Sequence, residues 1–263
     1  MYARDMRSSR SIVWAVWKAL FLREAVSRLY AGRAAWLWIL LEPIVHLVFL
    51  NLLFGVILQS MISGVEGGLF ITTGVLGYLV TQHTAMRSKE AIASNSALFT
   101  YRQVLPVDTV LVRAALEAVL ISISGLSLLI GLGSLGYSVI PADFLQAFVA
   151  LAMLWFTGTG LGLMLSVAGV LLPEIAKVTE MLFRPLYFLS GVMYPPSAIP
   201  PAYQDWLLMN PLVHGIEAFR AAFFSQYHTI SGVSIGYIAA FAASTMCLGL
   251  ALHVRFAQRI TAQ

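Results

Sequence analysis

The chain has 263 residues, of which 59% are hydrophobic and only 11% are charged, with a formal charge of +4. A soluble globular domain carries roughly 45–50% apolar and about 25% charged residues, so these proportions exclude a disordered chain, a collagen-like repeat and an ordinary soluble enzyme. They predict an integral membrane protein. The single Cys247 also excludes a disulfide framework and a cysteine-based zinc site.

Residues 11–30 predict a helix that lies on the membrane surface. The apolar face of this helix is formed by Val13, Val16, Trp17 and Leu20. The opposite, polar face is formed by Ser11 and Lys18. The alternative is a plain basic anchor that only fixes topology. Because Lys18 interrupts the first apolar stretch and no small-residue cleavage site follows it, no cleavable signal peptide is expected.

Six apolar runs are long enough to cross a bilayer, which takes about 20 residues. They lie at about 36–58, 69–86, 110–133, 144–171, 178–194 and 233–254. The runs are continuous rather than alternating, which favours helices over a barrel, so we predict an all-α membrane fold with one transmembrane domain over residues 1–263. The fifth run is the weakest, since Arg184 and Pro185 interrupt it near its start.

Basic residues predict the orientation. If the six runs are spans, 15 of the 16 lysines and arginines fall on one side and only Arg220 falls on the other. By the positive-inside rule, both termini are then cytoplasmic. The basic residues report orientation here, and no nucleic-acid partner is expected.

Residues 195–231 form an outer connection that is too apolar for a solvated loop. Four prolines break it, and Asn210 followed by Pro211 predicts a helix start. Glu217 and Arg220 lie one turn apart in that helix and can pair. We interpret the connection as re-entrant half-helices, a backbone tolerated only when it packs on protein or lines a cavity. Its candidate gate residues are Asn210, His214, Glu217 and Arg220.

Catalytic motifs are missing. The chain has no GxxxxGK[ST] phosphate loop, no HExxH and no GxSxG, and its five histidines show no ligand spacing. We therefore expect no enzyme activity, no metal site and no bound cofactor in this chain.

Polar and aromatic residues inside the runs are candidates for a transport path. Ionisable or amide groups at membrane depth are costly and commonly functional; here they are Glu42, His46, Asn51 and Glu117. Aromatic rings can stack on sugars, and the candidates are Tyr187, Phe188 and Tyr194. The alternatives are interhelical hydrogen bonding for the first group and ordinary packing for the second. Gly158 with Gly162, and Gly232 with Gly236, have the GxxxG spacing that permits close helix packing.

Three stretches carry a resemblance to a known family. They are WLWILLEPIVHLVFLNLLFG at 36–55, LFTYRQVLPVDTVLVRA at 98–114, and LSGVMYPPSAIP with WLLMNPLVHGIEAFR between 189 and 220. With them the chain resembles the permease subunit of bacterial ATP-binding-cassette exporters for capsular polysaccharide, of the type 2 exporter superfamily.

The resemblance implies a multi-pass homodimer in the bacterial inner membrane that exports lipid-linked polysaccharide. Two copies of a separate cytoplasmic subunit would bind ATP and Mg²⁺, and periplasmic and outer-membrane export proteins would receive the glycan. The N-terminal helix and the loop at 87–106 would dock the ATP-binding subunit, with Lys89, Glu90, Arg102, Glu174 and Lys177 as candidate contacts. Alternatives are export of O-antigen, teichoic acid or a small drug, a membrane enzyme acting on lipid-linked glycan, and a structural scaffold.

Overall fold

The computed structural model describes residues 9–30, 32, 35–61, 65–101, 103–172 and 174–261, and in these ranges the chain forms helices and loops with no strand. The helices are α1 (Ser9–Leu29), α2 (Ala35–Met61), α3 (Gly67–Lys89), α4 (Ala91–Ser94), η1 (Ser96–Thr100), α5 (Pro106–Ser134), α6 (Phe144–Leu171), α7 (Glu174–Leu189), η2 (Pro196–Ala198), α8 (Pro201–Leu208), α9 (Pro211–Phe223), α10 (Ile235–Arg255) and α11 (Ala257–Thr261). The all-α prediction is confirmed.

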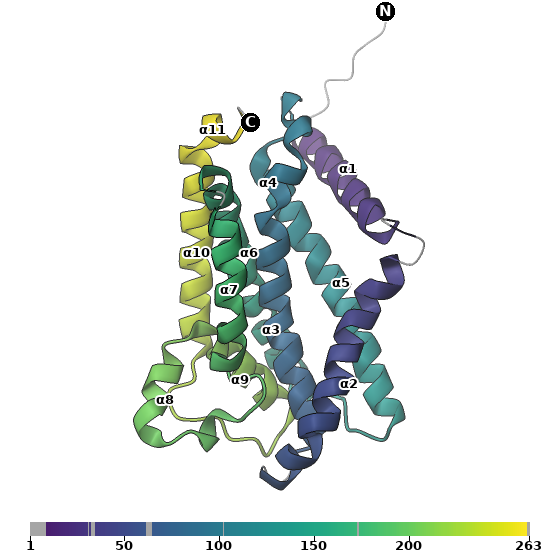
Figure 1. Ribbon diagram of the computed structural model, residues 1–263, viewed down its shortest axis with the longest axis vertical. Coiled ribbons are helices and arrows are strands. Elements are labelled where there is room, and N and C mark those ends of the chain that lie inside the picture. Colours follow the sequence, from purple (N-terminus) through teal and green to yellow (C-terminus); the bar gives the residue numbers. More distant parts are fainter. Residues whose placement is uncertain are drawn as a thin grey trace, which may run out of the picture.

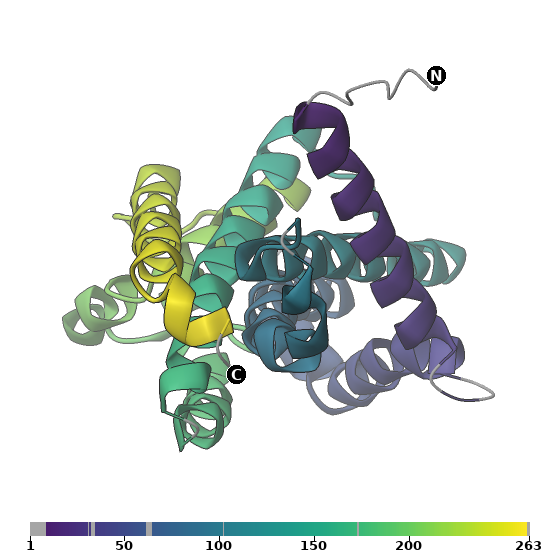
Figure 2. The same cartoon turned by 90° about the horizontal axis from the view of Figure 1, so that it is seen from above.

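The long helices form a bundle with two distinct ends. Helices α3, α6, α7 and α10 follow the long axis, while α2 and α5 are tilted (Figure 1). Helices α1 and α11 lie at one end, here the α1 end, and α8 and α9 lie at the other, here the α8 end. Helix α6 packs most extensively on α10 and α3, and α1 runs along the outside of the bundle against α5 (Figure 2).

Three helices, α5, α6 and α10, are long and apolar enough to cross a membrane, by length and composition and among the described residues. Each of the six predicted runs forms a helix, and α6 has the predicted bounds. Residues 11–30 fall within one helix and its following turn, and Val13, Trp14 and Val26 on α1 are exposed.

The fifth run differs from its prediction, because α7 begins four residues earlier than 178 and ends five residues earlier than 194. Glu174 to Lys177 therefore form its first turn rather than a connecting loop. The helix continues through Pro185 and ends before Gly191, whose φ of +65° favours glycine. Asn210 donates to the carbonyl of Leu189 at 3.2 Å, which satisfies one of the carbonyls left free at this helix end.

Close packing at one predicted GxxxG pair is confirmed. A Cβ added at Gly158 would lie 2.7 Å from the carbonyl oxygen of Thr81, and one at Gly162 would lie 2.5 Å from the Cβ of Ser88. Both neighbours belong to α3, so the two glycines let α3 and α6 approach each other. The second pair does not pack in this way, because Gly232 lies in a turn with φ of +102° and Gly236 meets only Ser234 of its own segment.

Replacing Gly158 with alanine is expected to destabilise the bundle by about 1–3 kcal/mol, the usual cost of overpacking. The measurement is the midpoint of thermal unfolding of the purified chain in detergent. Gly169→Ala on the same helix is the matched control, since nothing lies within 4 Å of a Cβ there. Equal midpoints for the two variants would contradict the close packing of α3 on α6.

Candidate functional site

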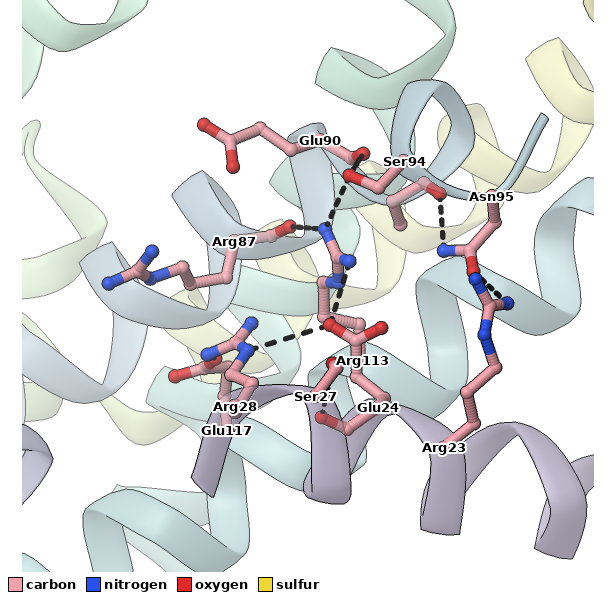
Figure 3. Close-up of polar contacts among 11 residues, drawn as sticks. Arg23, Glu24, Ser27, Arg28, Arg87, Glu90, Ser94, Asn95, Arg113 and Glu117 are labelled. Carbon is pink, nitrogen blue, oxygen red and sulfur yellow. Dashed lines mark hydrogen bonds and ion pairs between the residues drawn. The ribbon is translucent and has the colours of Figure 1, made fainter. Parts of the chain in front are cut away.

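Four charged side chains join α1 to α5 near the α1 end. Glu24 and Arg28 are four residues apart on α1, and Arg113 and Glu117 are four residues apart on α5, so each pair shares one helix face. Arg113 Nη2 lies 2.7 Å from Glu24 Oε1, Arg28 Nε lies 3.5 Å from the same oxygen, and Arg28 Nη1 pairs with Glu117 Oε1 (Figure 3). Positive and negative groups thus alternate across the contact. We call these four residues the α1–α5 ion-pair cluster.

The cluster is largely shielded from solvent. The exposed fraction of the side chain is 15% for Arg28, 13% for Glu24, 8% for Arg113 and 3% for Glu117. Charges removed from water in this way depend on one another, because taking away one partner leaves the other buried and uncompensated. The cluster therefore holds α1 in one position on α5.

Two further contacts extend this attachment along α1, and a third joins α5 to the end of α3. Trp17 donates to Asp108 Oδ1 at 2.9 Å, Arg23 donates to Asn95 Oδ1 at 2.8 Å, and Arg113 donates to the carbonyl of Arg87 at 3.2 Å. Asp108 belongs to the first turn of α5, where its other oxygen accepts from the amide of Leu105, and Asn95 follows α4. Helix α1, α5 and the connection from α3 to α5 that contains α4, here the α4 loop, are therefore linked into one unit (Figure 3).

Of these partners only Glu117 was named as a candidate site residue, and none of the contacts between them was predicted. The available signal was the pair of oppositely charged residues at i and i+4, Glu24 with Arg28 and Arg113 with Glu117. That signal shows which face of each helix is charged, but it does not show which helices meet.

The candidate docking residues lie at the α1 end but differ in exposure. Glu90, Glu174 and Lys177 are exposed. Lys89 is buried, at 6% exposure, and its Nζ lies 3.1 Å from Glu180 Oε1, so its side chain joins α3 to α7. Arg102 lies outside the described residues.

Four of the candidate path residues come together on one side of the bundle. Glu42, His46, Tyr187 and Phe188 line a cavity of about 470 Å³ between α2, α3 and α7, here the α2–α3–α7 cleft. His46 Nε2 and the Tyr187 hydroxyl are 3.2 Å apart. The cleft thus combines ionisable groups with aromatic rings.

The other path candidates lie elsewhere. Asn51 lines a separate cavity of about 590 Å³ between α2, α3 and α5, and its Nδ2 donates to the carbonyl of Leu47 at 3.0 Å. Tyr194 follows α7, and its hydroxyl donates to the carbonyl of Phe188 at 2.9 Å.

The four candidate gate residues are tied into the α8 end. Asn210 is the N-cap of α9, as predicted, and its side chain accepts from the amide of Leu212 at 3.0 Å. Ser234 donates its amide to His214 Nδ1 at 3.0 Å, so Nε2 carries the proton and donates to the carbonyl of Leu208 at 2.8 Å. These contacts hold α8 and the segment before α10 against α9.

Arg220 is fully buried and makes the densest set of contacts at this end. Its guanidinium donates to the carbonyls of Gly191 and Val192, both at 2.7 Å, and to Glu217 Oε1 at 3.1 Å. It also lies 3.7 Å from the centre of the Phe70 ring. The pairing of Glu217 with Arg220 expected from their spacing is therefore formed. The other contacts of Arg220 attach α9 to α3 and to the turn after α7.

Tyr227 completes the surroundings of this ion pair. Its hydroxyl donates to Glu217 Oε2 at 2.9 Å. Burial and the adjacent Glu217 carboxylate raise the pKa of the Tyr227 phenol, so the phenol stays protonated and remains a donor.

Comparison with known proteins places this arrangement in a family. A family model described as ABC-2 type transporter matches residues 15–224. The chain belongs to this family. The match begins inside α1 and ends just after α9. The α1–α5 ion-pair cluster, the α2–α3–α7 cleft and Arg220 of this chain therefore all lie within the part that matches the family.

Individual relatives of this ABC-2 chain are transport proteins. It is 36% identical over 236 residues to the polysialic acid transport protein KpsM of Escherichia coli. The aligned residues cover 90% of this chain and 91% of that protein. It is 27% identical over 245 residues, 93% and 92% of the two chains, to the capsule polysaccharide export inner-membrane protein CtrC of Neisseria meningitidis serogroup B. It is 24% identical over 257 residues, 98% and 97%, to the capsule polysaccharide export inner-membrane protein BexB of Haemophilus influenzae. These names agree with the expectation that the chain is not itself an enzyme.

Proposed function

We propose that the chain is the membrane-spanning subunit of an exporter that moves lipid-linked capsular polysaccharide out across the bacterial inner membrane. The observation that carries the proposal is the 36% identity, over 90% of the chain, to a protein named for polysialic acid transport. The α2–α3–α7 cleft supports it, because polar groups and aromatic rings together suit a sugar chain that enters from a membrane.

The proposed topology has six spans with both termini in the cytoplasm. The spans are α2, α3, α5, α6, α7 and α10, and α1 lies on the cytoplasmic surface. Support comes from the distribution of basic residues, and from the position of α1 and α11 at the same end of the bundle (Figure 1). The segment from η2 to α9 would then dip into the outer leaflet, where Asn210, His214, Glu217 and Arg220 would shape the exit.

The energy would come from a partner. In this proposal two copies of a cytoplasmic subunit bind ATP and Mg²⁺ and dock on a homodimer of this chain, while periplasmic and outer-membrane proteins receive the glycan. The α4 loop and the start of α7 carry the exposed docking candidates, so closure of the ATP-binding subunits would move α4, α1 and α5 together through their shared contacts.

Charge reversal at an exposed docking candidate tests the partner surface. Lys177→Glu is expected to weaken binding of the ATP-binding subunit about fivefold, since an exposed charge pair is worth about 1 kcal/mol at most. The measurement is the binding affinity between the purified subunits in detergent. Arg259→Glu on α11, also exposed at the α1 end, is the matched control; identical affinities for the two variants would remove Lys177 from the docking surface.

Deletion of the gene in its own host tests the proposed cargo. The deletion strain is expected to hold full-length, lipid-linked polysaccharide on the cytoplasmic side, and a plasmid copy is expected to restore surface polysaccharide. Cell fractionation followed by analysis of the glycan makes the measurement. Normal surface polysaccharide in the deletion strain would overturn the proposal and direct the search to another lipid-linked glycan or a small molecule.

A further inference from the structure

The α2–α3–α7 cleft continues toward the α1 end. A smaller cavity of about 50 Å³ lies next to it and is lined by Arg28, Arg87 and Glu117, among other residues. The two cavities share Glu42, Leu79 and His83 as lining residues, so they adjoin. Together they run from α1 and the end of α3 to the second half of α7.

The lining of the joined cleft is cationic. It contains three arginines, Arg28, Arg87 and Arg184, against two glutamates, Glu42 and Glu117. Arg28 and Glu117 pair with each other in the α1–α5 ion-pair cluster. Among the described residues, no hydrogen-bond acceptor or carboxylate lies within bonding distance of the guanidinium of Arg87 or Arg184, and both residues are exposed. Two arginines therefore remain available to an anion from outside the chain.

The two arginines lie at different depths. Arg87 is two residues from the end of α3 at the α1 end, which is the cytoplasmic end in the proposed topology. Arg184 lies ten residues beyond the start of α7, about 15 Å along the helix. A cation inside a bilayer is costly unless it faces a water-filled cavity or an opposite charge. The position of Arg184 in the cleft is thus favourable with an anion bound there.

Part of the lining of the cleft is apolar, beside the ionisable groups already described. Leu79, Phe183 and Phe188 line it together with Arg184. An arginine guanidinium presents several N–H donors in a planar fork that matches phosphate oxygens. A ligand that satisfies both kinds of lining has a phosphate joined to a hydrocarbon chain.

We propose that the joined cleft binds a lipid phosphate, with Arg87 and Arg184 as its cationic contacts and the apolar lining as the site of the adjoining chain. The phosphate belongs either to the lipid that anchors the cargo or to an ordinary anionic phospholipid. The assignment to a cargo anchor rests on the proposed function, whereas binding of a lipid phosphate does not.

The test is retention of phosphatidylglycerol by the purified full-length chain, measured by native mass spectrometry after exchange into micelles that contain phosphatidylcholine and phosphatidylglycerol. Arg87→Gln and Arg184→Gln are each expected to lower retention about tenfold, in line with the loss of a charge-assisted hydrogen bond. Arg255→Gln, an exposed arginine at the end of α10 outside the cleft, is the control and is expected to retain lipid like the wild type. Thermal unfolding of each variant checks that it is folded.

Equal retention by folded Arg87→Gln, Arg184→Gln and control variants would overturn the site. A second arm identifies the source of the phosphate. Displacement of bound phosphatidylglycerol by lipid-linked polysaccharide purified from the host assigns the site to the cargo anchor, and retention of phosphatidylglycerol in its presence assigns the site to bulk phospholipid. Normal surface polysaccharide in the deletion strain would overturn the proposed function without changing the lipid-binding result, so the two failures are distinguishable.

Discussion

Replacing Arg28 with methionine is expected to lower the free energy of unfolding by about 3–5 kcal/mol, the usual cost of removing one partner of a buried ion pair. The reason is that Glu117, at 3% exposure, loses the guanidinium that pairs with it. Thermal unfolding of the purified chain in detergent measures the loss. We also expect ATP hydrolysis by the bound partner to continue while export falls, because α1 then keeps only its other contacts with α5, those of Glu24 and Trp17.

A double variant separates charge burial from simple packing. Arg28→Met combined with Glu117→Met removes both charges and is expected to regain most of the lost stability, since no buried charge is left unpaired. Arg23→Met on the same helix is the matched control; its partner Asn95 is neutral, so its expected cost is about 0.5–1.5 kcal/mol. A double variant as unstable as Arg28→Met would contradict the role assigned to the ion-pair cluster.

Replacing Arg220 with methionine is also expected to lower the free energy of unfolding by about 3–5 kcal/mol. We expect this variant to export no polysaccharide. Among the described residues, the substitution leaves the buried Glu217 with Tyr227 as its one hydrogen-bond partner, and it frees the carbonyls of Gly191 and Val192. Helix α9 would then lose its attachment to the turn after α7. The measurements are thermal unfolding and the amount of surface polysaccharide in cells.

Two variants make the Arg220 result specific. Glu217→Gln keeps the side-chain shape but removes the carboxylate, and export is expected to fall while the chain still inserts into the membrane. Arg259→Met is the matched control, because Arg259 also lies over an aromatic ring, that of Phe256 at 5.9 Å, but is exposed. Wild-type surface polysaccharide in Glu217→Gln would show that the pair has no part in an outer gate.

Hydropathy and local chemistry predicted much of the fold. The six apolar runs all form helices, and among the described residues three of these helices, α5, α6 and α10, are long and apolar enough to cross a membrane. The helix start at Asn210 and Pro211 and the pairing of Glu217 with Arg220 are local features, separated by only a few residues. Local spacing is visible in a single sequence, so these predictions succeeded.

Contacts between distant segments were not predictable in the same way. Arg28 pairs with Glu117 and Arg113 pairs with Glu24 on another helix, 89 residues away in the case of Arg28 and Glu117. Nothing in the spacing along one helix identifies the other. Lys89, a docking candidate implied by the family resemblance, illustrates the same limit: its side chain is buried and lies 3.1 Å from Glu180 of α7, a partner that the spacing does not reveal. The end of α7 also depends on a distant residue, Asn210, which binds its last carbonyl.

The central claim is ATP-driven export of lipid-linked polysaccharide by this chain, and reconstitution tests it most directly. The chain and its ATP-binding partner would be placed in vesicles with the partner facing outward, and lipid-linked polysaccharide would be added outside. Protection of the glycan from an added glycan-degrading enzyme is the measurement. We predict protection that develops with ATP and is absent without it. ATP hydrolysis with the glycan still fully degradable would contradict the claim.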